Sequence, residues 1–355
     1  MTNNENGLKY RLFTIKNLTD WLFHNSQNGI SRKIIAVPRA YAFVVNPHAK
    51  EDDVVLSVVY NDADEPIGYT AVFGERFVRP VLHERYFWGS TQWLEPEYRG
   101  KGASWKMMKD IKEAVDNRYI ALDSTIASCR LDQKQGSRII YYPRYFMRFR
   151  TDAKTLKAKI KQKWVECKNK KILSQVRSEE YTNQYVNFID DESYRFISEH
   201  SSTNFFLRTQ EMLNWQLHNQ LYVQTKGDKH VDNELCEFGG YVDKISVEII
   251  KVYVKKQLVG IYVLHTIDDT CTLLYLYLDE CYKKNVYASI AASILDQNLR
   301  RFRTFNKCLF DFLCNTGITH LNKSQLYEEV SFTIPADFEV DASLQLQGGD
   351  GDMFA

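Results

Sequence analysis

Hydrophobic residues fall into short runs along the first third of the chain. Runs at 40–45, 54–60, 67–74 and 85–94 are rich in β-branched and aromatic residues, a composition typical of strands. Between the second and third runs, residues 61–68 (NDADEPIG) combine the Asn, Asp, Pro and Gly found in hairpin turns. The four runs therefore predict an antiparallel meander.

Beyond the fourth run, the spacing of apolar residues changes to that of a helix. Residues 104–115 place Trp, Met, Ile and Val at helical spacing between lysines, which predicts an amphipathic helix directly after a strand. Another apolar stretch follows at 119–128, and a short helix is expected at 137–142. The segment 152–185 is basic, with lysines around an apolar stripe, and predicts a connecting helix.

The second half of the chain repeats this order of elements. Its pattern predicts, in turn, a hairpin at 248–267, a strand at 271–278, a long helix at 285–302, a strand at 307–314, and a helix at 320–332 that runs into a last strand. We therefore expect an α/β (α+β) protein of two similar domains, each a mixed, mostly antiparallel sheet flanked by helices. The expected parts are a first domain at 1–151, the basic connection at 152–185, a second domain at 186–343 and a disordered, glycine-rich tail at 344–355.

Composition narrows the class of protein further. A chain of 355 residues, 44% of them hydrophobic, can form two packed cores. Its net charge of +1 produces no global field for nucleic acid or a membrane surface, so neither is expected as a partner. The seven cysteines lack the close pairs of zinc sites, and the first residues do not form a signal peptide. We expect a cytoplasmic protein without a metal.

The loop at 94–104 (LEPEYRGKGAS), between a predicted strand and a predicted helix, is suited to phosphate. Gly100 and Gly102 allow a tight turn and a close approach of the backbone to a ligand. The helix that follows offers free amides and the positive end of its dipole. Arg99 and Lys101 add positive charge where a pyrophosphate would bind.

This loop resembles motif A of the GNAT superfamily, the Arg/Gln-x-x-Gly-x-Gly/Ala loop that binds the pyrophosphate of acetyl-coenzyme A. Ser104 departs from the pattern, since Gly or Ala is usual there. The resemblance covers about residues 35–150 and implies a GNAT fold with acetyl-CoA, or another acyl-CoA, as co-substrate. The residues that it implies for coenzyme A binding are Trp93, Leu94, Arg99, Gly100, Lys101, Gly102, Ala103 and Ser104.

A second segment, SRIIYYPRYF at 137–146, resembles the family's (Ala/Ser)-x-x-x-Tyr-x-x-x-Gly-Phe helix, with Tyr145 in place of Gly. The resemblance implies that Tyr141 is the general acid that protonates the departing thiolate. The general base is not fixed in the superfamily, so its identity stays open. An amine must be neutral to attack, and the candidates for accepting its proton are His83, Glu84 and Asp123.

The second half resembles the same superfamily with an eroded loop. Residues 281–289 (CYKKNVYAS) stand at the loop position without a glycine, although Lys283 and Lys284 remain. Residues 321–332 keep the form of the tyrosine helix, with Tyr327 in register. We therefore expect a degenerate second domain.

Together these features predict an acyl-CoA-dependent N-acyltransferase that transfers an acetyl group to an amine on a small molecule by direct attack. Residues 205–217 resemble a segment of GNAT-like proteins encoded with surface-polysaccharide genes, which implies an aminosugar or a sugar nucleotide as acceptor. Two alternatives stay open. The second domain could perform the chemistry with Tyr327, or the protein could be an inactive module that binds acyl-CoA or a partner. We expect a monomer or a weak dimer.

Overall fold

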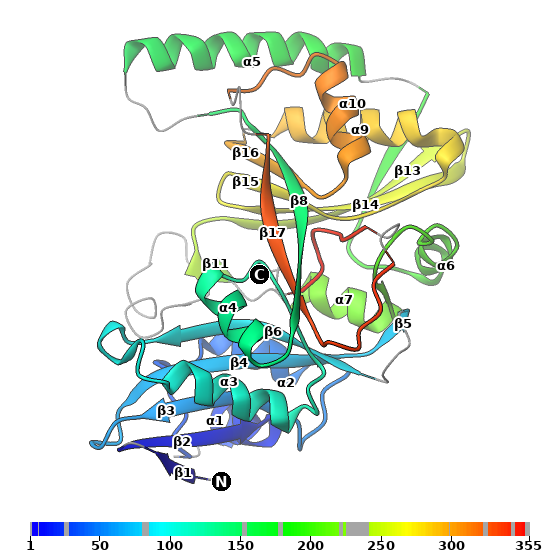
Figure 1. Cartoon of the computed structure of the whole chain (residues 1–355). Coiled ribbons are helices and arrows are strands. Elements are labelled where there is room, and N and C mark those ends of the chain that lie inside the picture. The colour runs from blue at the N-terminus through cyan, green and yellow to red at the C-terminus, as the bar shows by residue number, and fades with distance from the viewer. Residues whose placement is uncertain are drawn as a thin grey trace.

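The structure is a computed structural model of the chain (Figure 1). It describes residues 2–5, 7–24, 28–79, 85–150, 155–176, 180–219, 223–224, 241–297, 299–321, 326–341 and 345–351. Within these ranges, no helix is both long enough and apolar enough to cross a bilayer.

One mixed sheet runs through both halves of the described chain. Its strands follow the order β1-β2-β3-β4-β6-β7-β17-β8-β16-β15-β14-β13-β9, and all neighbours are antiparallel except β6 with β7 and β15 with β16. The strands of the sheet are β1 (Thr2–Glu5), β2 (Leu8–Thr14), β3 (Val54–Tyr60), β4 (Pro66–Glu75), β6 (Tyr86–Leu94), β7 (Tyr119–Leu122), β8 (Arg138–Arg148), β9 (Thr182–Val186), β13 (Ile245–Val254), β14 (Gln257–Ile267), β15 (Thr270–Leu278), β16 (Arg301–Thr304) and β17 (Tyr327–Ile334). The α/β class and the mostly antiparallel sheet predicted from the sequence are confirmed.

Two short pairs of strands lie outside this sheet, namely β5 (Phe77–Arg79) with β10 (Leu207–Arg208), and β11 (Val223–Gln224) with β12 (Tyr241–Val242).

Helices lie on both faces of the large sheet. The helices are α1 (Ile15–His24), α2 (Val37–Val44), α3 (Ala103–Ala114), α4 (Ile126–Lys134), α5 (Leu156–Val176), α6 (Asp191–Glu199), α7 (Gln210–His218), α9 (Lys283–Asp296) and α10 (Lys307–Asn315), with 3-10 turns η1 (Pro96–Tyr98) and η2 (Glu280–Tyr282).

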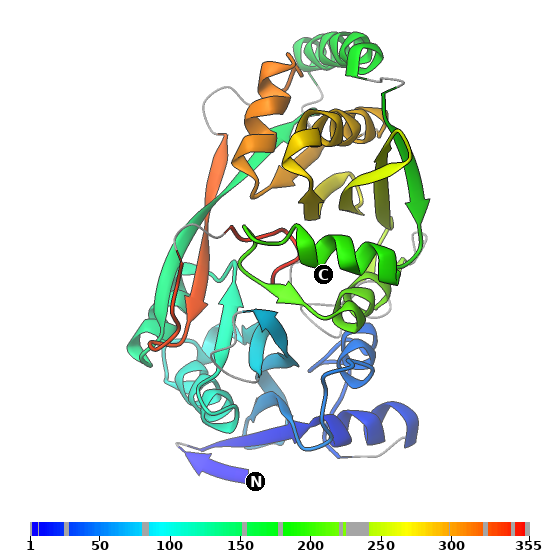
Figure 2. The same ribbon diagram turned by 90° about the vertical axis from the view of Figure 1, so that its right-hand side faces the viewer.

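The two halves exchange strands. The last strand, β17, lies between β7 and β8, and β8 in turn pairs with β16 of the second half. Figure 2 shows β8 and β17 side by side along one edge of the molecule, spanning from one half to the other. A boundary at residue 151 therefore does not separate two independent sheets, because β8 and β17 each complete the sheet of the other half.

The basic segment at 152–185 is part of the second half. Helix α5 lies alongside α9 (Figures 1 and 2), with Val165 buried. Asn169 Nδ2 donates to the Thr319 carbonyl at 3.0 Å, and the Thr319 amide donates to Asn169 Oδ1 at 2.8 Å. Strand β9 then pairs with β13. The predicted connection is thus a packed helix and an edge strand.

Several short apolar runs adopt the other secondary structure from the one predicted. The run at 40–45 lies in helix α2, which begins with Pro38 in its first turn, and the run at 307–314 forms α10, capped by Asn306. Conversely, the helix expected at 137–142 is strand β8, and residues 327–332 of the helix expected at 320–332 belong to β17. The apolar pattern of a short run does not distinguish a helix from a strand. Segments 137–142 and 327–332 became strands because β8 and β17 pair with each other.

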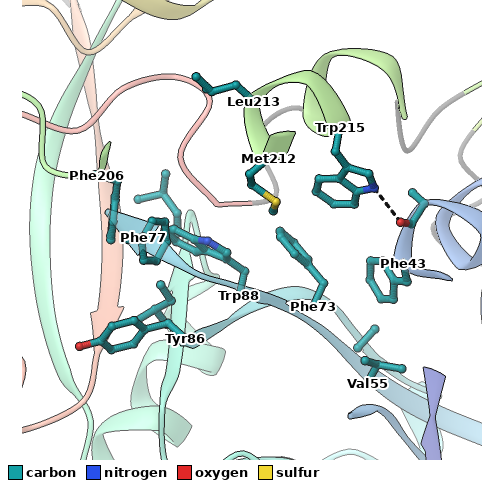
Figure 3. Packing of buried hydrophobic residues seen from close by; sticks show 14 of the residues in the cluster. Phe43, Val55, Phe73, Phe77, Tyr86, Trp88, Phe206, Met212, Leu213 and Trp215 are labelled. Atoms are coloured by element: carbon teal, nitrogen blue, oxygen red, sulfur yellow. Dashed lines mark hydrogen bonds between the residues drawn. The ribbon is translucent and has the colours of Figure 1, made fainter. Parts of the chain in front are cut away.

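The largest core joins the two halves (Figure 3). Trp88 of β6 is fully buried and packs against Phe206 and Phe332, which come from the second half of the chain. Trp215 of α7 donates its indole hydrogen to the Ala42 carbonyl of α2 at 2.9 Å. Because these aromatic side chains interlock, the two halves share one hydrophobic core.

Candidate active site

The first candidate site is the gap between β6 and β7. These strands pair in parallel only at Phe87 with Tyr119 and Trp88 with Ile120, and they separate beyond that point. From Gly89 onward, the edge of β6 that faces β7 pairs with no other strand of the described chain. Unpaired backbone groups on such an edge are available to a ligand.

Strand β6 carries a bulge at the start of this gap. Ala71 of β4 lies opposite Thr91, whereas Val72 lies opposite Gly89, so Ser90 is an extra residue in β6. A bulge leaves the extra residue outside the ladder and turns its backbone. The bulge thus turns the backbone of β6 at the point where the strands separate.

The glycine loop lies at the far end of the same gap. Gly100 and Gly102 have φ angles of +76° and +90°, a region that other residues rarely adopt. Gly102 precedes α3 and provides no side-chain cap, so the amides of the first turn are left for a ligand. Arg99 Nε donates to the Leu94 carbonyl at 2.9 Å, which fixes the arginine beside the loop.

A cavity of about 680 Å³, here called the loop cavity, lies between this loop and α4. Three cations line it, Arg99 from the loop and Arg130 and Lys134 from α4, and none of the residues around it is acidic. Such a cavity favours a polyanion. The other residues around it are Gln92, Trp93, Leu94, Gly100, Gly102, Ser104, Trp105, Thr125, Ala127, Ser128 and Leu131.

Most of the predicted coenzyme A residues line the loop cavity, and two do not. Ala103 is buried in the core beneath α3, and the Lys101 ammonium lies 5.6 Å from the centre of the Tyr98 ring, outside the cavity lining. Arg130 and Lys134 were missed by the sequence analysis. Their spacing of four on α4 would have shown that they share a helix face.

A smaller space of about 230 Å³, here called the gap cavity, continues from the loop cavity between β6 and β7. The two spaces share Gln92, Thr125 and Ser128 as lining residues. Ser128 Oγ donates to Gln92 Oε1 at 3.1 Å and so links α4 to β6. Beneath the cavity, the buried Arg39 of α2 donates to Ser90 Oγ.

Tyr119 lies in the gap cavity, where the strands begin to separate. Its ring packs against Gly89, since a Cβ at Gly89 would lie 2.3 Å from the Tyr119 hydroxyl oxygen. Within the described residues this hydroxyl forms no hydrogen bond. Burial, together with the nearby Asp132 and Cys129, raises the pKa of Tyr119 well above its ordinary value. The phenol therefore stays protonated and can donate a hydrogen bond to a ligand.

Of the candidate bases, Asp123 is at the site. It lines the gap cavity at the end of β7, in a left-handed conformation with φ of +60°. Its Oδ2 lies 2.8 Å from Arg144 Nη1, and this ion pair holds the carboxylate at the cavity wall. Glu84 and His83 lie outside the described residues.

The structure does not place Tyr141 where the sequence predicted. Tyr141 is on strand β8 opposite Ser331 of β17, its side chain is 55% exposed, and it lines neither cavity. The helix that follows β7 is α4, which contains no tyrosine. Tyr327 likewise lies on a strand and is half-exposed.

In the second half, the corresponding gap is filled by residues 346–351, here called the C-terminal segment. Strands β15 and β16 pair in parallel at residues 270–272 and 301–303 and then separate, as β6 and β7 do. Here, however, the Gly349 amide donates to the Leu274 carbonyl at 2.9 Å, and the Leu276 amide donates to Gln347 Oε1 at 2.8 Å. About 20 Å³ remains beside the segment. Residues 346–351 of the tail expected to be disordered are therefore buried, because they complete this strand edge, whereas residues 344 and 352–355 lie outside the described residues.

Substitution of Gly348 should test how tightly the segment fits. A Cβ at Gly348 would lie 2.2 Å from the Leu273 carbonyl oxygen, so the backbone would have to shift. We expect Gly348→Ala to lower the free energy of unfolding by about 1–3 kcal/mol, the usual cost of overpacking. Urea denaturation measures this change, and unaltered stability would mean that the segment is not held in the gap.

The same segment takes part in a buried ion cluster. Arg208 Nε lies 2.6 Å from Glu75 Oε1, and Arg208 Nη1 lies 2.6 Å from Asp350 Oδ1, with all three side chains fully buried. Trp88 Nε1 donates to the other oxygen of Glu75. The cluster joins β4, β10 and the C-terminal segment, and it contacts Trp88, which directly precedes Gly89 of the gap cavity.

A scan against models of known protein families finds no match, and a search of curated proteins finds no significant one. Solved structures share the fold. A GCN5-related N-acetyltransferase from Kribbella flavida aligns over 94% of this chain and 73% of its own, with 11% identity and a TM-score of 0.51. Saccharomyces cerevisiae N-myristoyltransferase with bound myristoyl-CoA aligns over 94% of this chain and 84% of its own, with 9% identity and a TM-score of 0.53.

The chain therefore has the fold of the GCN5-related N-acetyltransferases, or GNAT fold, as the loop motif predicted. Each half of the chain contains a pair of parallel strands that separate, with a helix between the two paired strands in the sequence. At 9 to 11% identity these similarities concern the fold.

Proposed function

We propose that this protein is an acyl-CoA-dependent N-acyltransferase whose active site is the gap of the first half. The observation that supports it most is the continuity of the loop cavity, lined by Arg99, Arg130 and Lys134, with the gap cavity at Tyr119. The cationic space suits the phosphates of coenzyme A, and the narrow space suits its thioester. In the second half, the C-terminal segment occupies the corresponding gap, so we assign a single donor site.

In the proposed reaction, the neutral amine of the acceptor attacks the thioester carbonyl carbon. The carbonyl oxygen becomes negative and accepts a hydrogen bond from the backbone of β6 where this strand separates from β7. The carbon–sulfur bond then breaks as the amide forms. Tyr119 donates a hydrogen bond to the sulfur as it becomes a thiolate, and the ammonium proton passes to Asp123 through water.

We propose acetyl as the acyl group. The gap cavity measures about 230 Å³, and the ring of Tyr119, which packs on Gly89, lines it. A short acyl group fits a space of this volume, which favours acetyl over a long chain. The proposed acceptor is a small-molecule amine, with an aminosugar or sugar nucleotide as the expectation from sequence.

Charge reversal at Arg99 tests the proposal. We expect Arg99→Glu to weaken the binding of acetyl-CoA by about 100-fold or more, since a charge-assisted hydrogen bond contributes about 1.5–3 kcal/mol and the new carboxylate would also repel the pyrophosphate. Isothermal titration calorimetry of the full chain with acetyl-CoA measures the change.

The matched control is Lys109→Glu, which makes the same change of charge on the exposed side of α3, outside both cavities. It should bind acetyl-CoA as the wild type does. Equal affinity of Arg99→Glu and wild type, or no binding of any acyl-CoA by the wild type, would contradict the proposed donor site.

A further inference from the structure

Three arginines share one face of the sheet where the two halves join. Arg301 and Arg303 lie on β16, and Arg303 is opposite Phe146 of β8. Arg144 is two residues before Phe146, and alternate residues of a strand point to the same face. The opposite face carries Phe302, which is buried beneath α9 and α10 in another core. The arginine face therefore turns away from these helices.

The positive charge of this cluster is only partly compensated. Arg144 is paired twice, with Asp123 at 2.8 Å and with Glu328 at 2.9 Å. Arg301 stacks on Phe146, with its guanidinium carbon 4.4 Å from the ring centre. Among the described residues, no carboxylate pairs with Arg301 or Arg303, and the Nε of each is buried without a hydrogen bond. Two guanidinium groups are therefore available to a ligand.

The pKa shifts of Arg301 and Arg303 reflect the same excess of positive charge. Burial lowers the pKa of Arg303, and the nearby Arg144 and Arg301 lower it further. Burial also lowers the pKa of Arg301. Glu328 raises this pKa, but the nearby Arg148, Arg144 and Arg300 lower it, and the net effect is a lowered pKa. Both guanidinium groups remain charged near neutrality, since arginine begins from a pKa above 12. A bound anion would relieve this repulsion.

The cluster lies next to the proposed active site. Asp123 lines the gap cavity and is directly paired with Arg144. Its charge also acts on Arg303. A small molecule could therefore place one end at the thioester and another end against Arg301 and Arg303.

We propose that Arg301 and Arg303 bind an anionic group, a carboxylate or a phosphate, on the acceptor amine. The inference rests on the proposed function, since it requires the thioester to lie in the first gap. It also assigns the second half a role, because β16 supplies both arginines while its own gap holds the C-terminal segment. Arginine suits this task because its planar fork binds carboxylate and phosphate groups through two hydrogen bonds.

Three related amines test the proposal on the full chain saturated with coenzyme A. Ethanolamine has no anionic group, β-alanine has a carboxylate, and O-phosphoethanolamine has a phosphate. We expect at least one anionic amine to bind about tenfold or more tightly than ethanolamine in calorimetric titrations, the scale of one charge-assisted hydrogen bond. The stronger of the two identifies the group. Equal binding of all three amines, including binding of none, would overturn the proposal.

Variants localise the effect. The double variant Arg301→Gln, Arg303→Gln should lose the preference for the anionic amine, and Arg303→Lys should retain part of it because the charge remains. Arg195→Gln, on the exposed surface of α6, is the control. A double variant that keeps the full preference would refute the assignment of these arginines. Titration of each variant with acetyl-CoA separates this failure from failure of the proposed function, since the double variant should bind the donor normally.

Discussion

Arg208→Met is expected to lower the free energy of unfolding by about 3–5 kcal/mol, the usual cost of removing one partner from a buried ion pair. Arg208, Glu75 and Asp350 are all fully buried, and the arginine is the cation between two carboxylates. Methionine fills a similar volume beside Phe77 and Phe206 but leaves both carboxylates uncompensated. Urea denaturation at neutral pH measures the loss.

The pH dependence of stability gives this prediction a second readout. Burial raises the pKa of Glu75 from 4.5 to about 7, and burial also raises the pKa of Asp350. The folded state therefore binds these protons more tightly than the unfolded chain does. The contribution of Glu75 to stability is complete below pH 4.5 and is lost as the pH rises to about 7. In Arg208→Met the pKa of Glu75 should rise further, so the loss should extend to higher pH.

Arg195→Met on the exposed side of α6 provides the matched control, and its stability should match the wild type at every pH. The prediction fails if Arg208→Met unfolds at the same urea concentration as the wild type. It also fails if the variant is destabilised equally at pH 5 and pH 8, because the cost would then come from packing and not from buried charge.

Tyr119→Phe is expected to lower kcat by about 100- to 1,000-fold with little change in KM, as for removal of one donor to a developing negative charge. The hydroxyl lies in the gap cavity beside Gly89, stays protonated through its raised pKa, and forms no hydrogen bond with the described residues. Phenylalanine retains the ring that lines the cavity, so binding of the donor should persist. Release of free coenzyme A in the presence of an acceptor measures the rate.

Tyr141→Phe makes the companion measurement, since Tyr141 is the general acid that the sequence resemblance implies. Its exposed position on β8, outside both cavities, leads us to expect a rate within about threefold of the wild type, the range of ordinary surface substitutions. A large loss in Tyr141→Phe together with normal activity of Tyr119→Phe would reverse the two assignments.

The conformation of the glycine loop could be predicted from sequence because it depends on neighbouring residues. Gly100 and Gly102 adopt the left-handed conformations that only glycine adopts readily, and Arg99 lies beside them. The strand, the loop and the helix are adjacent along the chain, so the spacing of residues within this one segment predicts their order. The same holds for the amphipathic helix α3 that follows.

Tyr141 and Tyr119 show where this reasoning fails. Segment 137–146 matched a helical motif, but β17, nearly 190 residues later, pairs with it and makes it a strand. The sequence does not distinguish Tyr119 from the other tyrosines among its 22, because the position of Tyr119 in the cavity depends on the separation of β6 from β7 and on the space left by Gly89. Neither fact is local in the chain.

The sequence by itself determined the α/β class, the repeated order of elements and the tight glycine loop before α3, since these depend on periodicity and on the backbone freedom of single glycines. Only the tertiary structure decided that the two halves exchange β8 and β17, that Arg144 of the arginine cluster pairs with Asp123, and that residues 346–351 fill the second gap. These features arise from hydrogen bonds and charges between segments far apart in the chain, whose register no local pattern encodes.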